Sequence, residues 1–389
     1  MSKEYLDKKV LLLDGYGRQI PSILNQLHRL GCIVTTINES KLDVGNTSRY
    51  PKKKIVVRGI REDIQIYRTA VLDALEKENY DILFPVLEKA TEISLSDEIK
   101  EKYPNIKIIA ATREAFEKAY DKQATMKICM ENGIPCPITK MDDETMEEYL
   151  SKVSFPICAK PRKGSGGAGF KRIMNREELD RYIEDGTIQV EEYVIQELIP
   201  KGGYQYGGYV MMDKNHKPQF TMAVESCRWF PIDGGPGCYI RTINHKEMNE
   251  SSNKLLEKLE WTSFGHIGYI MDPRDNTPKV MEINGRIPAS IKICDWAGMN
   301  PVKSMLDLAY GKELTPIHTP VEEHLALRYF HTDIMWFLKN PNRFKAKPSW
   351  FYCFKQKDYI FSWADPLPFF SYAIEHAMSY KKDMKKRQH

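Results

Sequence analysis

The sequence lacks several features that would assign a protein to a class at once. No apolar run reaches the ~18 residues that a membrane-spanning helix needs. The eight cysteines include no Cys-x-x-Cys pair, and the nine histidines form no cluster with metal-ligand spacing. The first residues are charged and lead into no apolar core of the kind that a signal peptide has. We therefore expect a cytoplasmic protein with reduced cysteines and no transmembrane segment.

An excess of charge of one sign is also missing. Lysine and arginine number 57 against 53 aspartates and glutamates, which leaves a formal charge of +4. So small an excess argues against binding to nucleic acid through bulk charge. Part of it lies in the segment KKDMKKR at residues 381–387. A solvated helix end is the simpler interpretation of that segment, and contact with an acidic membrane surface is the alternative.

The first third of the chain has the pattern of an α/β protein. Its 389 residues, of which 42% are apolar, are enough for two to three domains with cores of their own. An apolar strand at 9–14 is followed by a turn at Gly15-Tyr16-Gly17 and a helical pattern at 20–30. Further strands and helices alternate up to about residue 120. This alternation predicts a parallel sheet with helices on both faces.

A glycine-rich loop follows an apolar strand in the middle of the chain. Residues 156–170 read PICAKPRKGSGGAGF, so the strand delivers Lys160 and the loop then offers Lys163 and four glycines. Glycine lets backbone N–H groups turn toward a bound anion, which predicts a phosphate-binding loop. A flexible hairpin tip is the alternative. The loop has no Walker A spacing and opens no helix.

A second polar stretch lies about 120 residues further on, in VMEINGR at 280–286. At the period of a strand, Glu282, Asn284 and Arg286 share one face. A carboxylate beside an amide oxygen suits Mg²⁺, and an arginine can hold a phosphate or carboxylate in bidentate fashion. A half-buried edge strand with a polar outer face is the alternative. The lysine, the loop and this strand together favour a nucleotide site.

These motifs, together with VIQELI at 194–199, resemble the ATP-grasp superfamily, in particular its carboxylate–amine ligases and the ATP-binding fold of carbamoyl-phosphate synthase large chains. The resemblance covers residues 8 to 313. It implies an α/β fold with a lid of α+β type. The expected domains are a Rossmann-like domain at 1–120, the ATP-grasp lid at 121–197, the ATP-grasp C subdomain at 198–313 and a C-terminal α/β appendage at 314–389.

The resemblance also implies which residues bind ATP. The backbone around Gln196 contacts the adenine, and Tyr204 stands near the place of a ribose-binding glutamate. Lys122 reaches the phosphates, although taken alone it would be a solvated helix residue. The implied ATP-binding residues are Lys122, Lys160, Lys163, Gly164, Ser165, Gly166, Gly167, Gly169, Gln196, Glu197, Leu198, Ile199 and Tyr204.

For the metal, Mg²⁺ or Mn²⁺, the resemblance implies Glu282 and Asn284, with Asp272 as a further candidate. The family's first acidic ligand falls four residues before Asp272, where this chain has Gly268. A turn cap is the alternative role for Asp272.

The expected catalytic residues are Arg286, Arg228 and Lys160. Arg228 precedes a glycine-rich turn and is read as a clamp for developing charge, with a structural arginine as the alternative. Glu88, after a strand end in the first domain, is a further candidate for binding the second substrate.

The resemblance predicts an ATP-dependent ligase that joins a carboxylate to an amine through an acyl phosphate, giving ADP and phosphate. Its partners would be a small-molecule carboxylate and amine, one of them an amino acid, and a homodimer is expected. Two alternatives stay open. Gly268 is compatible with a nucleotide-binding regulatory module of weak or no turnover, and a phosphotransferase that stops at the acyl phosphate would use the same residues.

Overall fold

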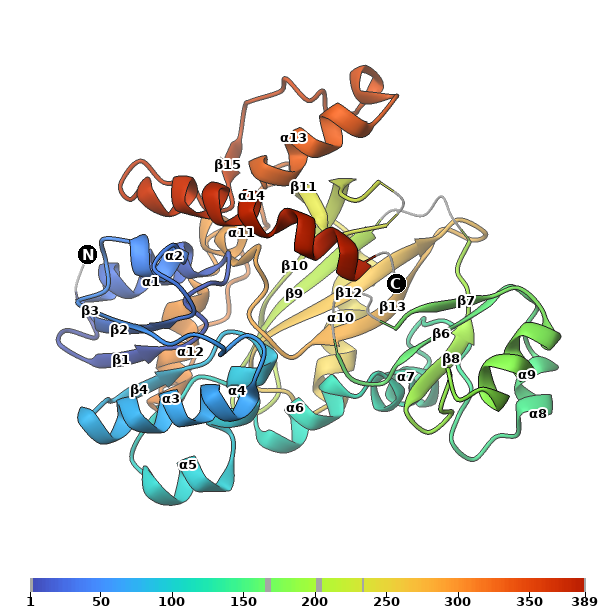
Figure 1. The fold of residues 1–389 in the computed structure, drawn as a ribbon, viewed down its shortest axis with the longest axis horizontal. Coiled ribbons are helices and arrows are strands. Elements are labelled where there is room, and N and C mark those ends of the chain that lie inside the picture. The colour runs from blue at the N-terminus through green and yellow to red at the C-terminus, as the bar shows by residue number, and fades with distance from the viewer. Residues whose placement is uncertain (1–2, 165–168, 201–204, 233, 388–389) are drawn as a thin grey trace.

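The computed structural model describes residues 3–164, 169–200, 205–232 and 234–387, with side chains as far as residue 378. Three sheets organise these residues (Figure 1). A parallel sheet with helices on its faces, a small antiparallel lid and a large central sheet follow one another along the chain, which confirms the α/β class with an α+β lid.

The first sheet is wholly parallel, as the alternation of strands and helices predicted, with the order β3-β2-β1-β4-β5. Its central strand β1 is buried along Val10, Leu11 and Leu12, as expected of a strand covered on both faces. The strands are β1 (Lys9–Leu12), β2 (Ile33–Asn38), β3 (Lys53–Val56), β4 (Ile82–Phe84) and β5 (Lys107–Ile108). The helices are α1 (Ile20–Leu30), α2 (Val44–Thr47), α3 (Ile64–Lys77), α4 (Glu88–Ser94), α5 (Asp97–Lys102) and α6 (Arg113–Tyr120).

The turn after β1 needs its first glycine. A Cβ on Gly15 would lie 2.0 Å from Oδ1 of Asn38, and the Gly15 N–H donates to the carbonyl of Ile37 at 2.8 Å. The turn therefore packs directly against the end of β2, which is the structural role that its sequence predicted.

The lid is an antiparallel sheet with the order β7-β6-β8. A small core of its own, centred on Tyr149, Ile157 and Leu179, joins this sheet to its helices. The strands are β6 (Ile157–Pro161), β7 (Lys171–Ile173) and β8 (Tyr193–Glu197), and the helices are α8 (Met146–Leu150) and α9 (Arg176–Glu184). The helix before them, α7 (Lys122–Glu131), packs on β13 of the central sheet.

The central sheet has the order β13-β12-β9-β10-β11-β14-β15. One face packs through Val210, Ala223 and Ile267 on α7 and α10 (Lys246–Lys258). The other face, with Tyr209 and Met222, shares a core with the first domain. The strands are β9 (Gln205–Met212), β10 (Pro218–Trp229), β11 (Gly237–Ile243), β12 (Ser263–Asp272), β13 (Thr277–Asn284), β14 (Ala326–Arg328) and β15 (Gln356–Asp358), and α11 (Ile291–Trp296) and α12 (Pro301–Ala309) follow β13.

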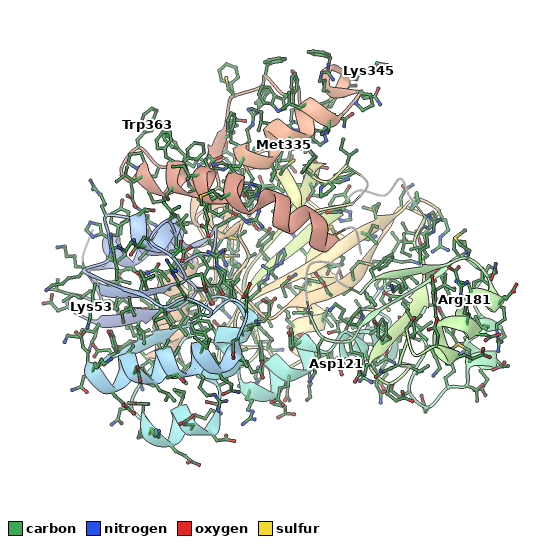
Figure 2. The ribbon with its side chains drawn as sticks, viewed as in Figure 1. Lys53, Asp121, Arg181, Met335, Lys345 and Trp363 are labelled. Carbon is green, nitrogen blue, oxygen red and sulfur yellow. The ribbon has the colours of Figure 1, made fainter. Side chains whose placement is uncertain are left out.

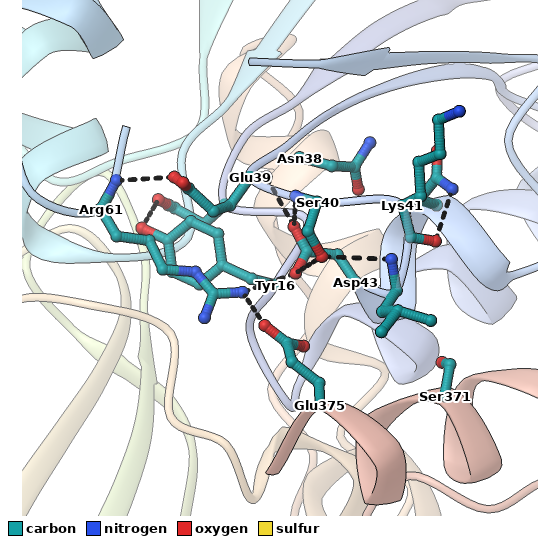
Figure 3. A network of polar contacts seen from close by, with 12 residues as sticks. Tyr16, Asn38, Glu39, Ser40, Lys41, Asp43, Arg61, Ser371 and Glu375 are labelled. Atoms are coloured by element: carbon teal, nitrogen blue, oxygen red, sulfur yellow. Dashed lines mark hydrogen bonds and ion pairs between the residues drawn. The ribbon is translucent and has the colours of Figure 1, made fainter. Parts of the chain in front are cut away.

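The C-terminal segment extends this sheet instead of forming a separate layer. β14 pairs with β11, and β15 pairs with β14. The segment also contains α13 (Phe330–Lys339), the 3-10 turn η1 (Arg343–Lys345) and α14 (Leu367–Arg387). α14 lies on α2 of the first domain (Figure 1), where Glu375 pairs with Arg61 at 2.7 Å (Figure 3). Among the described residues, no helix combines the length and the apolar character that crossing a bilayer requires.

Candidate functional site

Lys160 reaches from the lid to the central sheet. Residues Cys158 and Ala159 of β6 are buried, and the next side chain crosses to β13, where its Nζ donates to the carbonyl of Met281 at 3.2 Å. Burial lowers the pKa of Lys160, and the negative charge of Glu282 opposes that shift. The lysine is therefore held close to the carboxylate that the sequence assigned to the metal.

Lys122 approaches the same carboxylate from the first turn of α7. Its Nζ donates to the carbonyl of Gly164 at 2.6 Å, and its backbone N–H donates to the carbonyl of Arg162 at 3.0 Å. Burial lowers the pKa of Lys122, against the opposing effects of Glu282, Glu88 and Asp121. The structure thus brings two lysines, 38 positions apart in the sequence, to one acidic group.

The ends of the glycine-rich loop have the backbone that the sequence predicted. Gly164 has a φ of 105° and Gly169 a φ of 75°, conformations that favour glycine. A Cβ on Gly169 would also lie 2.7 Å from Cγ of Pro161. Lys163 is exposed at the start of the loop. The predicted loop residues Ser165, Gly166 and Gly167, and the ribose candidate Tyr204, lie outside the described residues.

Glu282 and Asn284 lie on one face of β13, as the strand period predicted. On the neighbouring β12, Gly268 pairs with Glu282 and His266 pairs with Asn284. A Cβ on Gly268 would lie 3.4 Å from Cγ of Glu282 and 4.0 Å from its Oε1, which is ordinary contact. The sheet can therefore accept a Cβ beside the carboxylate without a clash, at the position where the resemblance expects a second acid.

Arg286 closes the site from the end of β13. Its Nε lies 3.0 Å from Oε1 of Glu88, which opens α4 of the first domain. The two elements are held together by the backbone, because the N–H of Ile287 donates to the carbonyl of Val86 at 3.0 Å. The candidate Glu88 is thus brought to Arg286, beside the metal candidates.

Sequence reasoning missed His266, which lies against Tyr209 with ring centroids 4.6 Å apart. Burial, with a smaller effect of Arg286, lowers the pKa of His266 to about 3, so the ring is neutral. No hydrogen-bond partner of its Nδ1 is found among the residues that the structure describes. The only signal in the sequence was its place two residues before Gly268 on a strand.

Comparison with known proteins identifies the fold that carries this arrangement. Residues 119–290 match the model of the ATP-grasp domain family. This segment contains Lys122, Lys160, Glu282 and Arg286, so these candidate site residues all lie within the part of the chain that matches the ATP-grasp model.

Curated relatives are carbamoyl phosphate synthase large chains. The protein from Xylella fastidiosa (strain Temecula1) is 25% identical over 293 residues, which are 69% of this chain and 27% of that protein. The protein from Vibrio cholerae is 26% identical over 263 residues, 63% of this chain and 24% of that protein. The chain therefore spans about a quarter of the length of these relatives.

Solved structures share the fold over most of the chain. A biotin carboxylase from Campylobacter jejuni superposes with a TM-score of 0.66 at 16% identity, over 82% of this chain and 74% of that one. An N5-carboxyaminoimidazole synthetase from Staphylococcus aureus, solved with ADP, gives a TM-score of 0.60 at 16% identity, over 81% and 80%. At these identities the comparisons establish the fold of the ATP-grasp domain and its flanking regions.

Within the ATP-grasp domain, Gln196 and Glu197 end the lid strand β8. The Gln196 side chain is buried and donates to Oγ1 of Thr139 at 3.2 Å. The Glu197 N–H donates to the carbonyl of Ile138 at 2.8 Å. Leu198 and Ile199 follow directly, half-buried and buried. Adenine binding along the backbone of this segment remains a prediction.

The Glu197 carboxylate belongs to a buried ionic cluster. It lies 2.8 Å from Nη2 of Arg274 and 2.9 Å from Nζ of Lys279, and it accepts the N–H of Ile138 at 3.0 Å. Burial acts to raise the pKa of Glu197, but these hydrogen bonds outweigh it and lower the pKa. The cluster links the lid strand to the β12–β13 hairpin, a role that the sequence did not reveal.

Asp272, a metal candidate in the sequence, is a member of this cluster, and the structure shows it in the alternative role of a turn cap. Its carboxylate lies 2.5 Å from Nη2 of Arg274 and 2.9 Å from Nζ of Lys279, and it accepts the N–H of Arg274 at 3.0 Å as a turn cap. Along β12 it lies about 13 Å from Gly268, the residue that pairs with Glu282. Asp272 acts as a turn cap because the backbone N–H and the guanidinium of Arg274 both donate to its carboxylate.

Arg228, a catalytic candidate in the sequence, is found in the alternative role of a structural arginine. Its side chain is buried, and Nε and Nη2 donate to Asp333 of α13 at 2.6 and 3.0 Å, while Nη1 donates to the carbonyl of Pro348 at 3.1 Å. The guanidinium also lies 4.0 Å from the ring centroid of Tyr239. It therefore fastens the C-terminal segment to β10 and has no surface for a substrate.

The ionic cluster predicts a pH-dependent contribution to stability. Hydrogen bonds from Arg274 hold the pKa of Asp272 below its usual range. Because this pKa is lower in the folded than in the unfolded protein, the ionised carboxylate stabilises the fold. This stabilisation is complete above the unfolded-state pKa, near pH 4, and is lost as the pH falls through the folded-state pKa. We expect Asp272→Asn to lower the free energy of unfolding by about 2 kcal/mol at pH 7. Urea unfolding at pH 7 and at pH 3 measures the difference, which should shrink at pH 3. An equal loss at both pH values would contradict this account.

Proposed function

We propose that the chain is an ATP-dependent ligase that joins a small-molecule carboxylate to an amine through an acyl phosphate, giving ADP and phosphate. The nearness of Lys122 and Lys160 to Glu282, with Arg286 paired to Glu88 just past the end of the same strand, carries the proposal. Three elements from the lid, the central sheet and the first domain meet there. Acidic and basic groups gathered in this way suit a metal-bound polyphosphate better than a neutral ligand.

The candidate ligands Glu282 and Asn284 fit one metal ion whose remaining ligands come from the ATP phosphates. In the described part of the chain, no group of three His, Cys, Asp or Glu side chains is placed to hold a metal by itself. Glu282 and Asn284 offer a carboxylate and an amide on one face, and Mg²⁺ is commonly held by one or two carboxylates together with substrate phosphates. When bound, Mg²⁺ supplies neutralisation of the charge that develops on the phosphate oxygens.

The chain's own groups can then position both halves of the reaction. Lys122 and Lys160, with the backbone at Gly164 and Gly169, would hold the ATP phosphates. Arg286 would hold the substrate carboxylate, whose oxygen attacks the γ-phosphorus as the bond to ADP breaks. The amine nitrogen then attacks the acyl carbon, phosphate leaves with that oxygen, and the amine proton passes to solvent. Catalysis of this kind is positioning and charge stabilisation.

Gly268 gives a direct test of the metal assignment. A Cβ at this position would meet only ordinary contacts with Glu282. We expect Gly268→Glu to lower the Mg²⁺ concentration needed for half-maximal nucleotide turnover by about 10-fold, because a second carboxylate joins the first. Mg²⁺ titration of ADP formation measures this, with Gly268→Ala as the matched control. An unchanged Mg²⁺ requirement in a folded Gly268→Glu protein would argue against Glu282 as the ligand.

The same glycine favours a second candidate function, a nucleotide-binding regulatory module. A site with one carboxylate binds the metal less firmly than a site with two. The two functions differ in turnover, not in ATP binding. An amino acid as one substrate, a homodimer and a location in the cytoplasm remain predictions.

ADP release tests the proposed function. The full chain would be incubated with Mg²⁺-ATP and pooled carboxylates and amines, and Lys160→Ala would be compared with Lys127→Ala, which changes an exposed lysine on α7. The ligase predicts ADP release that depends on one pool, is lost in Lys160→Ala and survives in Lys127→Ala. ATP binding by calorimetry without ADP release in any pool would instead favour the module.

A further inference from the structure

The C-terminal segment exposes large apolar side chains along its outer surface. Over half of the large hydrophobic residues that the described chain exposes lie between Phe330 and Met378. Trp363 is 89% exposed, Phe344 72% and Phe354 71%. We call this surface the aromatic ridge and define it as Phe330, Ile334, Leu338, Phe344, Phe351, Phe354, Trp363, Leu367 and Phe370. Contiguous apolar surface of this kind marks an interaction site in a soluble protein.

The ridge is continuous along α13. Phe330, Ile334 and Leu338 follow one another at intervals of four residues, so one side of this helix presents apolar groups to solvent. At the end of α13, Phe337 lies 5.6 Å from Phe344 and 5.8 Å from Phe351, measured between ring centroids.

The start of α13 joins the ridge to a second group of rings. Phe330 lies 6.3 Å from Phe369, which lies 5.5 Å from Phe370, and Phe361 lies 4.9 Å from Trp363. Figure 2 shows Trp363 and Lys345 at the outer edge of this segment, at different ends of it.

Basic side chains accompany the ridge on its exposed side. Lys339, Lys345 and Lys347 are exposed, and the guanidinium of Arg343 lies 5.2 Å from the ring centroid of Phe344. The sequence of α14 continues with five basic residues and one aspartate between 381 and 387. The solvent-facing charge of the ridge is therefore positive.

The acidic groups described between Phe330 and Met378 are engaged within the fold. Asp333 and Asp365 are buried, the first against Arg228 and the second accepting from Oγ of Ser48 at 2.5 Å. Glu375 pairs with Arg61 (Figure 3). Asp358 accepts the N–H groups of Ile360 and Phe361, each at 2.8 Å. These carboxylates are used within the fold and do not offset the outer positive charge.

We propose that the aromatic ridge binds the surface of an anionic lipid bilayer. Aromatic side chains flanked by lysine and arginine are the composition of surfaces that lie in the membrane interface, where rings enter the headgroup region and cations meet lipid phosphate. Because no described helix could cross a bilayer, the segment lies on the membrane and does not span it. The ridge is independent of the ATP-grasp site and would bring that site to a membrane-bound substrate or enzyme.

The charge pattern argues against a second copy as the occupant. A two-fold interface places the same patch against itself, so the basic side chains of the ridge would face one another. Like charges brought together across an interface are unfavourable. The centre of a protein interface is also depleted of lysine, whereas lysines interleave with the rings here.

Vesicle flotation of the full chain tests the proposal. The probe would be vesicles of phosphatidylcholine with about 30% phosphatidylglycerol, compared with vesicles of phosphatidylcholine alone, at low and high salt. The ridge variant carries Phe344→Ser, Phe351→Ser and Phe354→Ser. The matched control carries Leu6→Ser, Ile66→Ser and Met130→Ser, three exposed apolar residues elsewhere. Lys339→Gln, Lys345→Gln and Lys347→Gln form the charge variant.

The proposal predicts binding to the anionic vesicles that weakens with salt. It predicts a loss of at least about 10-fold in both the ridge and the charge variants, and none in the control. The emission of Trp363 should shift to the blue on binding, and Trp363→Phe should remove that shift. Equal binding by the ridge variant would overturn the proposal. Absence of vesicle binding, or self-association in sedimentation that the ridge variant removes, would overturn it as well.

Discussion

Replacing Glu282 with glutamine is expected to lower the rate of Mg²⁺-dependent ADP formation by at least about 100-fold. The amide keeps the shape of the side chain but removes the only carboxylate on this face of the β12–β13 hairpin near Lys160, as far as the described residues go. A metal held by Asn284 and phosphates alone is bound weakly, so the charge that develops on the phosphates is poorly neutralised. Steady-state ADP formation measures the effect.

Two controls separate loss of the metal from loss of the fold. Glu313→Gln changes a glutamate that is 86% exposed and pairs only with Lys214 at the surface, so it should leave the rate unchanged. Calorimetry without Mg²⁺ should show that Glu282→Gln still binds ATP, because Lys122 and Lys160 remain. A variant that forms ADP at the wild-type rate would remove Glu282 from the mechanism.

Replacing Asp333 with alanine is expected to lower the free energy of unfolding by about 3–5 kcal/mol. The carboxylate is buried between two arginines, Arg228 at 2.6 Å and Arg328 at 2.7 Å. Its removal leaves two guanidinium groups in the interior without an acidic partner. Thermal and urea unfolding measure the loss.

The matched control is Arg228→Met, which leaves Asp333 paired with Arg328 and should cost less. Because the two residues are in contact, the double variant should lose less stability than the sum of the two single losses. ATP turnover per folded molecule should be unchanged in Arg228→Met, since Arg228 is a structural residue. A large fall in turnover at full stability would restore Arg228 as a catalytic residue.

The sequence revealed those parts of the site that depend on local pattern. The period of a strand placed Glu282 and Asn284 on one face, and the glycines flanking the loop have the backbone that glycine favours. The turn-cap alternative for Asp272 was also a local inference, and it was the correct one. Such features are fixed by spacing of a few residues.

The partners of buried charges could not be predicted in this way. Asp333 lies 105 positions from Arg228, and Lys279 lies 82 positions from Glu197. These pairs depend on how strands and helices pack, which spacing along the chain does not determine. β14 and β15 are three residues each, too short for a periodic signal, so their place in the central sheet was not foreseen.

The most direct test of the central claim follows the oxygen atoms of the carboxylate. The full chain would be incubated with Mg²⁺-ATP, the pool that elicits ADP release and an ¹⁸O-labelled carboxylate, and the phosphate would be analysed by mass spectrometry. An acyl-phosphate mechanism predicts one ¹⁸O atom in each phosphate released, because the attacking oxygen leaves with the phosphate. It predicts no labelled phosphate from Glu282→Gln. Phosphate that is formed at the full rate without label would contradict an acyl phosphate and the ligase with it.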